Sequence, residues 1–338
     1  MYNAENIFTF ENVSFGYHAD KVNSILIRDF SGEFKEGEFV AVIGRNGTGK
    51  STILKSLVRL IPLIKGKILL KGKLFSQYSP SEYSRIVSFV STDLPKTAGM
   101  TVFEMVALGR FPHTNWLGTL KMEDHAKIDT AIELTGLKDL KNKHLYRISD
   151  GERQRAIIAR TLAQDTPVII LDEPTAFLDL PNKYELAGLL VKLASMGKTI
   201  IMSTHDTGIA LRFPDKLLII RDNLLTFGSP EDQILRGEFN RIFQSPGFHV
   251  DRATGQIEIV KENGRMICLE GDDEVAIAWT KKALKRAGFI ASQQQTSDPC
   301  IKVSSLNNSF HFLLMRNNES EEFNNIYDLI NYLKSNLY

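Results

Sequence analysis

Apolar and polar positions alternate between two patterns along the first two thirds of the chain. Segments 38–43, 168–171 and 199–202 are short and almost wholly apolar, which is typical of strands buried on both faces of a parallel sheet. Residues 51–61 instead place their apolar side chains at helical spacing, and Pro62 ends the pattern. Strands that alternate with helices in this way predict an α/β fold built on a mostly parallel sheet.

A second region, residues 93–163, has helical rather than strand patterning. The spacing of its apolar residues predicts helices over 101–108, 122–135 and 151–163. Because no buried strand pattern interrupts it, we interpret this stretch as a helical insertion beside the sheet.

The last eighty residues change character again. The predicted strands are 257–260, 301–303 and 310–314, and the predicted helices are 273–287 and 326–337. In the first of these helices Val275, Ala278, Trp279 and Leu284 are expected to face the core. We therefore predict a large domain over residues 1–254 and a small α+β domain over residues 255–338. The small domain could regulate the large one, stabilise a dimer, bind an effector or serve only as packing.

Composition and charge narrow the class of protein. Of 338 residues, 41 are Lys or Arg and 40 are Asp or Glu, so the net charge is +1. This balance argues against a nucleic-acid-binding protein, which would carry a basic excess. With only Cys268 and Cys300, a disulfide framework is not expected and a reducing compartment is favoured. No secretory signal and no apolar run of about 18 residues is visible.

A glycine-rich loop follows the first buried strand. Its sequence, Gly44-Arg45-Asn46-Gly47-Thr48-Gly49-Lys50-Ser51, fits the pattern G-x-x-x-x-G-K-[ST]. Glycines let successive backbone N–H groups point at phosphate oxygens, Lys50 supplies a positive charge, and the Ser51 hydroxyl is a ligand for Mg²⁺. The helix that begins there directs its positive end at the same anion. Residues 44–51, together with Thr52, are therefore predicted to bind the phosphates of a nucleoside triphosphate.

Two adjacent acids follow the buried strand 168–171. Carboxylates at the C-terminal end of such a strand lie beside the phosphate loop of a neighbouring strand. We expect Asp172 to hold Mg²⁺, directly or through water, and Glu173 to polarise the attacking water.

At this point the chain resembles the nucleotide-binding subunit of an ABC transporter. The matching motifs are Walker A (Gly44–Ser51), Walker B (Val168–Asp172), a signature (Ile148-Ser149-Asp150-Gly151-Glu152), a D-loop (Ala176–Asp179), a switch-histidine segment (Ser203–Asp206) and an aromatic A-loop (Phe15–Tyr17). They cover about residues 7–230. The resemblance implies the P-loop ABC cassette, with a mostly parallel sheet, an antiparallel edge and a helical insertion. It also implies an ATPase that uses ATP and Mg²⁺.

The resemblance assigns roles within one subunit. Tyr17 would stack on adenine, because stacking requires only a flat apolar ring. His205 would hydrogen-bond the γ-phosphate and orient water near Glu173. Together with Lys50, these residues form the predicted catalytic group.

The resemblance also implies a second copy of the chain. In the family, Ser149, Gly151 and Glu152 at a helix start contact the γ-phosphate of ATP held by the other subunit. Asp179 would shape the contact between the two cassettes. Ser149 also suits an ordinary helix cap, and it could serve both purposes.

Two positions depart from the family. A glutamine usually ends the strand at 86–90, where this chain has Thr92, and Thr92 has an oxygen ligand on a shorter arm. Asp93 or a water molecule could replace the missing metal contact. Asp150 takes the place of the first signature glycine, and we expect its carboxylate to turn outward, away from phosphate.

The implied biological role is energy coupling for a membrane importer. Thr101-Val102 followed by Gly109-Arg110-Phe111-Pro112 resembles the subgroup that imports iron-siderophores, haem and vitamin B12. The partners implied are transmembrane permease subunits, a second copy and, indirectly, an external solute-binding protein, with the cassette at the cytoplasmic face of the membrane. An importer of another solute, a soluble ABC ATPase acting on ribosomes or DNA, and a P-loop kinase or GTPase stay open as alternatives.

Overall fold

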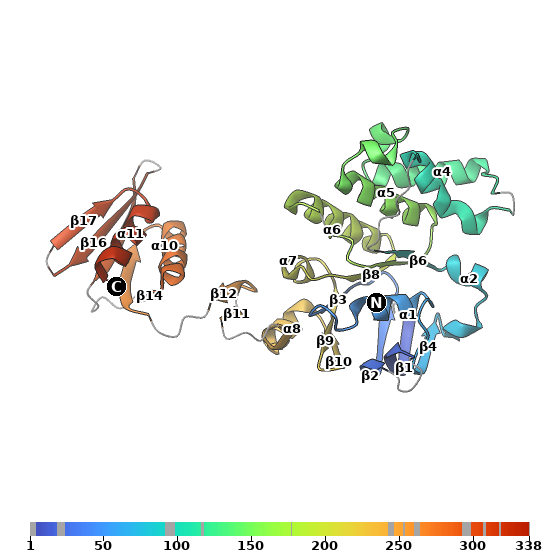
Figure 1. The fold of residues 1–338 in the computed structure, drawn as a ribbon, viewed down its shortest axis with the longest axis horizontal. Helices are drawn as coiled ribbons and strands as arrows, with labels where there is room; N and C mark the ends of the chain where they lie inside the picture. The colour runs from blue at the N-terminus through green and yellow to red at the C-terminus, as the bar shows by residue number, and fades with distance from the viewer. Residues whose placement is uncertain are drawn as a thin grey trace. The chain divides into compact units, whose positions relative to one another are not determined.

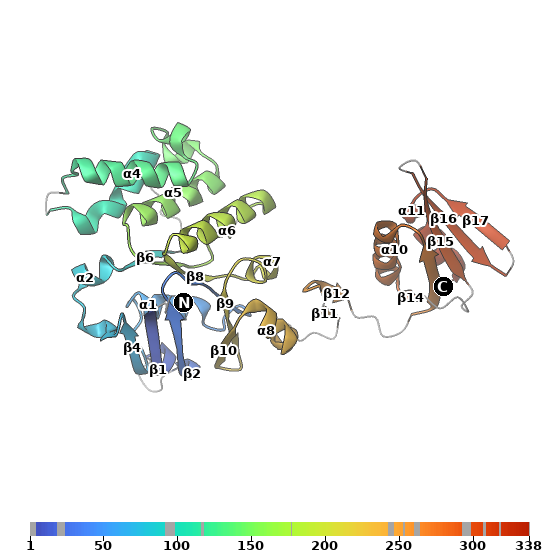
Figure 2. The same ribbon diagram turned by 180° about the vertical axis from the view of Figure 1, so that it is seen from behind.

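The structure, a computed structural model, divides the chain into two compact units, Met1–Phe243 and Gln244–Tyr338 (Figures 1 and 2). It describes residues 5–18, 24–91, 99–115, 118–176, 178–242, 247–252, 254–259, 264–292, 299–306, 309–317 and 319–337. The division at 243/244 lies eleven residues before the predicted border at 254/255. Each unit is described by itself.

A six-stranded sheet forms the centre of unit 1. Its order is β10 (Leu224–Gly228), β9 (Lys216–Arg221), β3 (Phe39–Gly44), β8 (Thr199–Ser203), β7 (Val168–Leu171) and β6 (Val87–Val90). All neighbours are parallel except β10 and β9. Every residue of β3, β7 and β8 is buried, which explains their almost continuous apolar sequences. The predicted α/β class and its buried parallel strands are confirmed.

An antiparallel sheet packs against this centre through a helix. Its strands, in spatial order, are β2 (Ser24–Lys35), β1 (Asn6–Tyr17), β4 (Lys65–Leu70) and β5 (Lys73–Leu74). Helix α1 (Lys50–Leu57) buries Ile53, Leu54 and Leu57 in the core that the two sheets share. The helix ends four residues earlier than predicted. Arg59 adopts a left-handed φ of 63°, and the Leu60 N–H returns to the Lys55 carbonyl, which closes the helix early.

The helical insertion has its own small core. Its main helices are α3 (Val102–Ala107), α4 (Met122–Leu134) and α5 (Asp150–Ala163), joined by the short helices η2 (Leu108–His113), η3 (Lys138–Leu140) and η4 (Leu145–Arg147). Val106, Ile128 and Ala159 are among the buried residues at their contact. Within this core Arg110 Nε lies 2.8 Å from Asp124 Oδ1, and both side chains are almost fully buried. The predicted helices are present within a residue or two of their expected ends.

The other helices of unit 1 flank the central sheet. They are η1 (Phe75–Gln77), α2 (Pro80–Ser84), α6 (Leu180–Ser195), α7 (Thr207–Ala210), α8 (Pro230–Leu235) and α9 (Glu238–Ile242). Across the described residues of both units, no helix combines the length and apolar character needed to cross a membrane.

Unit 2 contains a hairpin and a five-stranded sheet. The hairpin pairs β11 (Phe248–Val250) with β12 (Ile257–Ile259), and the sheet order is β14 (Ile290–Ser292), β13 (Met266–Gly271), β15 (Cys300–Leu306), β16 (Ser309–Arg316) and β17 (Glu319–Phe323). Helices α10 (Glu274–Ala287) and α11 (Ile326–Leu337) contact each other and cover one face (Figure 1). The α+β class is confirmed, but the sequence patterns missed β11, β13, β14 and β17.

The buried side of α10 differs from the prediction. Val275 and Trp279 are 64% and 60% exposed, whereas a stripe of mostly small residues faces the core. That stripe is Ala276, Thr280, Ala283, Leu284 and Ala287. The small side chains let α10 approach the sheet closely, and Trp279 instead lies beneath the ammonium of Lys282, 4.7 Å from its ring centre.

Candidate nucleotide site

The phosphate loop is a tight turn between β3 and α1. Gly47 and Gly49 adopt left-handed φ angles of 80° and 108°, which favour glycine. A Cβ on Gly44 would lie 2.7 Å from Thr48 Oγ1, whose hydroxyl donates to the Arg45 carbonyl. Gly49 is the N-cap of α1 and provides no side-chain cap, so the first N–H groups of this helix are suited to an anion.

Lys50 lies against this loop with its ammonium directed at backbone carbonyls. Its Nζ donates to the carbonyl oxygens of Gly44 at 3.1 Å and Arg45 at 3.4 Å, and lies 3.8 Å from Glu173 Oε1. Burial lowers the pKa of Lys50, while the charges of Glu173 and Asp172 act in the opposite direction. The loop therefore brings a largely buried cation to the place where a phosphate chain would lie.

The two acids that follow β7 are held by hydroxyl groups. The Ser51 and Ser203 hydroxyls donate to Asp172 Oδ1 at 3.0 and 2.6 Å. The backbone N–H of Glu173 donates to Ser203 Oγ at 2.8 Å. Ser203 is fully buried, and it fixes both acids through one oxygen. Sequence reasoning gave Ser203 no role, although its place on the neighbouring parallel strand, two residues before His205, was a usable signal.

Glu173 has an unusual backbone. Its φ is +47°, a left-handed value that costs a non-glycine residue of order 1–3 kcal/mol. In this conformation Oε2 lies 3.4 Å from His205 Nδ1, while the Lys50 ammonium lies on the other carboxylate oxygen. The Glu173 side chain is 25% exposed, so water can reach it. The three predicted catalytic residues are therefore close together.

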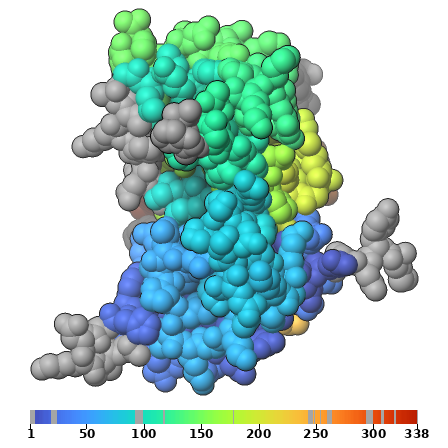
Figure 3. All heavy atoms as spheres, turned by 90° about the vertical axis from the view of Figure 1, so that its right-hand side faces the viewer, coloured from blue at the N-terminus to red at the C-terminus, as the bar shows by residue number. Residues whose placement is uncertain are grey.

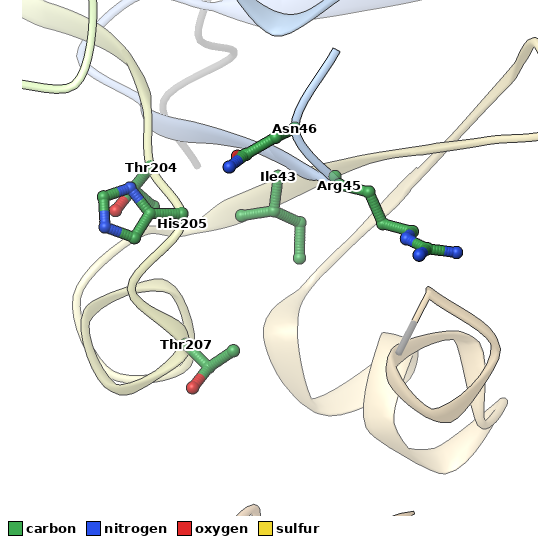
Figure 4. Close-up of a pocket in the computed structure, with 7 residues that line it drawn as sticks. Ile43, Arg45, Asn46, Thr204, His205 and Thr207 are labelled. Carbon is green, nitrogen blue, oxygen red and sulfur yellow. The ribbon is translucent and has the colours of Figure 1, made fainter. Parts of the chain in front are cut away.

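A cavity of about 400 Å³ opens beside the phosphate loop (Figure 4). Its lining residues come from the end of β3, the loop and the segment after β8, and they are Ile43, Gly44, Arg45, Asn46, Thr204, His205 and Thr207. Figure 4 shows the Asn46 amide directed toward the side of the cavity where His205 lies, whereas the Arg45 guanidinium extends away from His205.

Tyr17 stands at the end of β1. Its ring is 47% exposed, and its hydroxyl shares a hydrogen bond of 2.8 Å with Thr52 Oγ1 on α1. The side chain is thus anchored at its tip near the start of α1 while a large part of the ring stays accessible. This position suits the predicted contact with a base.

The signature residues begin α5 through a reciprocal cap. Ser149 Oγ accepts from the Glu152 N–H at 3.3 Å, and Glu152 Oε2 accepts from the Ser149 N–H at 2.8 Å. The hydrogen bond from the Ser149 backbone is the main cause that lowers the pKa of Glu152, followed by the Ser149 hydroxyl. Asp150 is turned outward as expected, since its side chain is 68% exposed and its Oδ1 lies 2.7 Å from Arg153 Nη1.

The D-loop lies next to the signature. Asp179 caps α6, because its Oδ1 accepts from the N–H and the side-chain amide of Asn182 at 3.1 and 2.6 Å. A Cβ on Gly151 would lie 3.6 Å from the same Asn182 side chain. Ser149, Gly151 and Asp179 therefore share one surface of unit 1. Their contact with a second copy stays a prediction.

The residues present suit a magnesium ion. Ser51 and Asp172 offer a hydroxyl and a carboxylate, the hard oxygen donors that Mg²⁺ prefers. Thr92 and Asp93 lie outside the described residues, so the metal contact expected from that loop stays a prediction.

Comparison with known families gives two matches. Residues 27–176 match the family described as ABC transporter, and residues 263–334 match the one described as iron ABC transporter C-terminal domain. The second match falls within unit 2, to which the sequence patterns assigned no family.

Relatives named as transport or import ATP-binding proteins match about two thirds of the chain. The achromobactin transport ATP-binding protein of Dickeya dadantii is 35% identical over 250 residues, which are 71% of this chain and 91% of that protein. The petrobactin import ATP-binding protein FpuC of Bacillus anthracis is 38% identical over 219 residues, 64% of this chain and 79% of the relative. The ferric enterobactin transport ATP-binding protein of Escherichia coli is 32% identical over 235 residues, with shares of 69% and 87%.

Solved structures agree with this assignment. A cassette from Clostridium perfringens, part of the ABC transporter complex cbiONQ, has a TM-score of 0.61 and 27% identity, and the match covers 70% of this chain and 94% of that one. A dimeric bacterial ABC transporter cassette has a TM-score of 0.58 and 25% identity, with shares of 66% and 98%. The chain therefore belongs to the ABC transporter family, as one of its ATP-hydrolysing cassettes.

Proposed function

We propose that this ATPase powers the import of a metal chelate, an iron-siderophore, haem or cobalamin, through separate permease subunits. The observation that carries the proposal is the convergence of Lys50, Glu173 and His205 on one side of the phosphate loop, with Ser51 and Asp172 hydrogen-bonded beside them. Together these residues supply a cation for the phosphates, oxygen ligands for a metal ion and a base for the attacking water.

The phosphate chain of ATP lies in the loop between β3 and α1 in this proposal. Backbone N–H groups of residues 45–52 and the Lys50 ammonium hold the β- and γ-phosphates. Adenine stacks on the accessible part of the Tyr17 ring, which Thr52 keeps close to the start of α1. Ser51 and Asp172 would hold Mg²⁺, which would supply positive charge next to the phosphate oxygens.

Hydrolysis needs a polarised water in line with the γ-phosphate. The Glu173 carboxylate accepts a hydrogen bond from this water and draws its proton as the oxygen attacks phosphorus. His205, whose Nδ1 lies 3.4 Å from Glu173 Oε2, donates from a ring nitrogen to a γ-phosphate oxygen. Ser203 keeps the backbone of Glu173 in its strained conformation, so the carboxylate is already aimed before the nucleotide arrives.

Two copies sandwich two ATP molecules head to tail. Ser149 and Gly151 at the start of α5 meet the γ-phosphate held by the other copy, and Asp179 lines the contact. Glu152 orders this helix start rather than touching phosphate, because its carboxylate already accepts two hydrogen bonds from Ser149. A solved cassette at 25% identity is dimeric, which supports the association of two copies.

An apolar groove offers a docking place for a permease helix. Its volume is about 450 Å³, and its lining residues are Val58, Arg59, Leu60, Pro80, Tyr83, Ser84, Val87, Ser88, Phe89 and Gln164. The groove adjoins the insertion, since Gln164 Nε2 donates to the Ser84 carbonyl and Arg85 Nε to the Pro112 carbonyl. Leu60 and Phe111 are 65% and 70% exposed. Figure 3 shows this face, with the residues around α2 between the N-terminal sheet and the insertion.

The solute class is inferred from the relatives. Their names describe import or transport of achromobactin, petrobactin and ferric enterobactin, and one at 31% identity describes cobalamin import. An external solute-binding protein would choose the chelate, and the cassette would work from the cytoplasmic face of the membrane. The sequence resemblance at 101–112 points to the same subgroup.

The decisive experiment is purification of the cassette with its permease in lipid discs. ATPase activity is measured with the external binding protein and ferric siderophore, haem or cobalamin in turn. Stimulation by one of these chelates is expected. Leu60→Asp should prevent permease binding while the isolated cassette still hydrolyses ATP, and Leu235→Asp, also on an exposed apolar residue but outside the groove, should change neither.

Two results would reject the proposal. Co-purification with ribosomes and no permease would favour the soluble alternative. Stimulation by a solute that binds no metal would leave the ATPase activity assigned but would show that the imported solute is not a metal chelate.

A further inference from the structure

The two cysteines of the chain meet on unit 2. Cys268 in β13 and Cys300 in β15 are direct partners in the parallel register, and their Sγ atoms lie 2.6 Å apart. Both are free thiols; Cys268 is fully buried and Cys300 partly so. Partners in register project to the same face of a sheet, so the chain places two sulfurs side by side.

A carboxylate and a thioether extend this cluster. Glu270 lies two residues beyond Cys268, and one of its carboxylate oxygens is within 4.8 Å of both sulfurs. Met315 in β16 is the register partner of Cys300, which adds a third sulfur to the row across β13, β15 and β16. The cluster lies on the face of the five-stranded sheet opposite to the one that α10 and α11 cover. Side chains alternate between the two faces along a strand, and the core residues Ile267 and Leu269 occupy the positions between those of the cluster.

We propose that Cys268, Cys300 and Glu270 bind a thiophilic divalent metal ion of the Zn²⁺ class. Two thiolates and one carboxylate are ligands that such an ion accepts, and three protein ligands leave one tetrahedral position for water or a further donor. Met315 is the soft side chain next to that position. The proposal concerns unit 2 alone and is independent of the role of unit 1.

The charges around Cys268 and Cys300 favour a bound cation over two thiolates without a metal ion. Burial, followed by the neighbouring Cys268 and the charge of Glu270, raises the pKa of Cys300 to about 12, whereas Lys302 acts in the opposite direction. Protonated thiols exchange slowly with disulfides, because the thiolate is the nucleophile. A divalent cation reverses the repulsion among the two thiolates and the carboxylate. Binding releases both thiol protons to solvent and widens the sulfur separation by about 1 Å for metal–sulfur bonds of about 2.3 Å.

Cobalt absorption tests the site directly. The full chain is reduced, stripped with a chelator and titrated anaerobically with Co²⁺ without nucleotide. We expect a thiolate-to-cobalt charge-transfer band that saturates at one equivalent and is bleached by Zn²⁺. The oxygen donors Ser51 and Asp172 produce no such band, so the nucleotide site does not contribute.

Variants separate the ligands from their surroundings. Cys300→Ser should reduce the band to half its strength or less, because at most one thiolate ligand remains, and Glu270→Gln should keep the band but weaken Co²⁺ binding by at least about tenfold. The matched control is Asp251→Asn, in the cluster His249, Asp251 and Glu258, which has no sulfur and should leave band and affinity unchanged. Protection of the wild-type thiols from alkylation by one equivalent of Zn²⁺ gives a readout that requires no variant to fold.

Three outcomes would overturn the proposal. The first is the absence of the band while a thiol assay finds two reduced cysteines. The second is a band of full strength in folded Cys300→Ser. The third is loss of both thiols to an intramolecular disulfide, in air, while one equivalent of Zn²⁺ is present.

Discussion

Replacement of Glu173 by Gln isolates the proposed general base. The substitution keeps the size of the side chain and leaves the backbone hydrogen bond to Ser203 intact. It removes the negative charge that lies 3.8 Å from Lys50 Nζ and 3.4 Å from His205 Nδ1. An amide cannot draw a proton from water, so the chemical step loses its base while the phosphate loop is unchanged.

The expected loss follows from the role of the carboxylate. A positioned general base contributes about 10²- to 10⁴-fold to a rate, which corresponds to about 3–5 kcal/mol of the activation barrier. ATP affinity should change little or rise slightly, because a negative charge beside the γ-phosphate is removed. The variant should therefore bind ATP, associate into dimers and fail to release phosphate.

The assay combines three measurements on the same preparation. Phosphate release gives kcat, calorimetry with ATP and Mg²⁺ gives affinity, and gel filtration with ATP reports association. Glu133→Gln is the control. The Glu133 side chain is 71% exposed, and within the described residues its salt bridge is to Lys138, which is exposed as well. A Glu173→Gln variant with wild-type turnover would refute the assigned base. A large loss of ATP affinity would instead assign Glu173 to nucleotide binding.

Three further substitutions test other parts of unit 1. Ser203→Ala should lower kcat about 10- to 100-fold with little change in the KM for ATP, since the loss of a buried hydrogen-bonding group costs about 1–3 kcal/mol; equal kcat in steady-state kinetics would contradict the positioning role. Tyr17→Ala should raise the KM for ATP about tenfold or more while Tyr17→Phe stays near wild type, and an equal effect of both would argue against stacking. Asp124→Asn leaves the buried Arg110 charge unpaired and should lower the free energy of urea unfolding by about 3–5 kcal/mol. The Lys121 backbone N–H, followed by Arg110, lowers the pKa of Asp124, so its contribution is present above the unfolded pKa near 4 and is lost as pH falls through the lower folded value; Asp124→Asn should lack that acid-side loss.

The parts of the fold that sequence predicted have strong periodicity or a motif. Strands β7 and β8 are buried on both faces, and α11 has a regular amphipathic stripe, so their patterns admit one interpretation. In unit 2 the exposed face of the sheet carries sulfur, polar and charged residues mixed together. Strands such as β17, with the sequence Glu-Ser-Glu-Glu-Phe, therefore show no apolar run. Their pairing is set by tertiary contacts that the local pattern does not contain.

In the nucleotide site, too, the sequence predicted some residues and missed the role of others. The motifs identified Lys50, Glu173 and His205 as neighbours, because parallel strands end at a common edge of the sheet. They included Ser203 in the switch-histidine segment but gave it no role of its own, since its importance comes from two hydrogen bonds across neighbouring strands. The same limit applies to Trp279, which looked like a core residue from its spacing and is held instead at the surface.

The aspartate in the signature shows how the chain accommodates a departure from its family. The Asp150 carboxylate at the start of α5 stabilises the helix through its dipole. Arg153, three residues later, forms an ion pair with it, and Nη1 lies 2.7 Å from Asp150 Oδ1. The side chain can leave the phosphate-facing surface because Ser149 and Glu152 already cap the helix without it. Gly151 lies close to α6, where a Cβ would be in ordinary van der Waals contact with the Asn182 side chain at 3.6 Å. The first glycine position therefore accommodates an aspartate in this chain because Arg153 stands three residues later to pair with it.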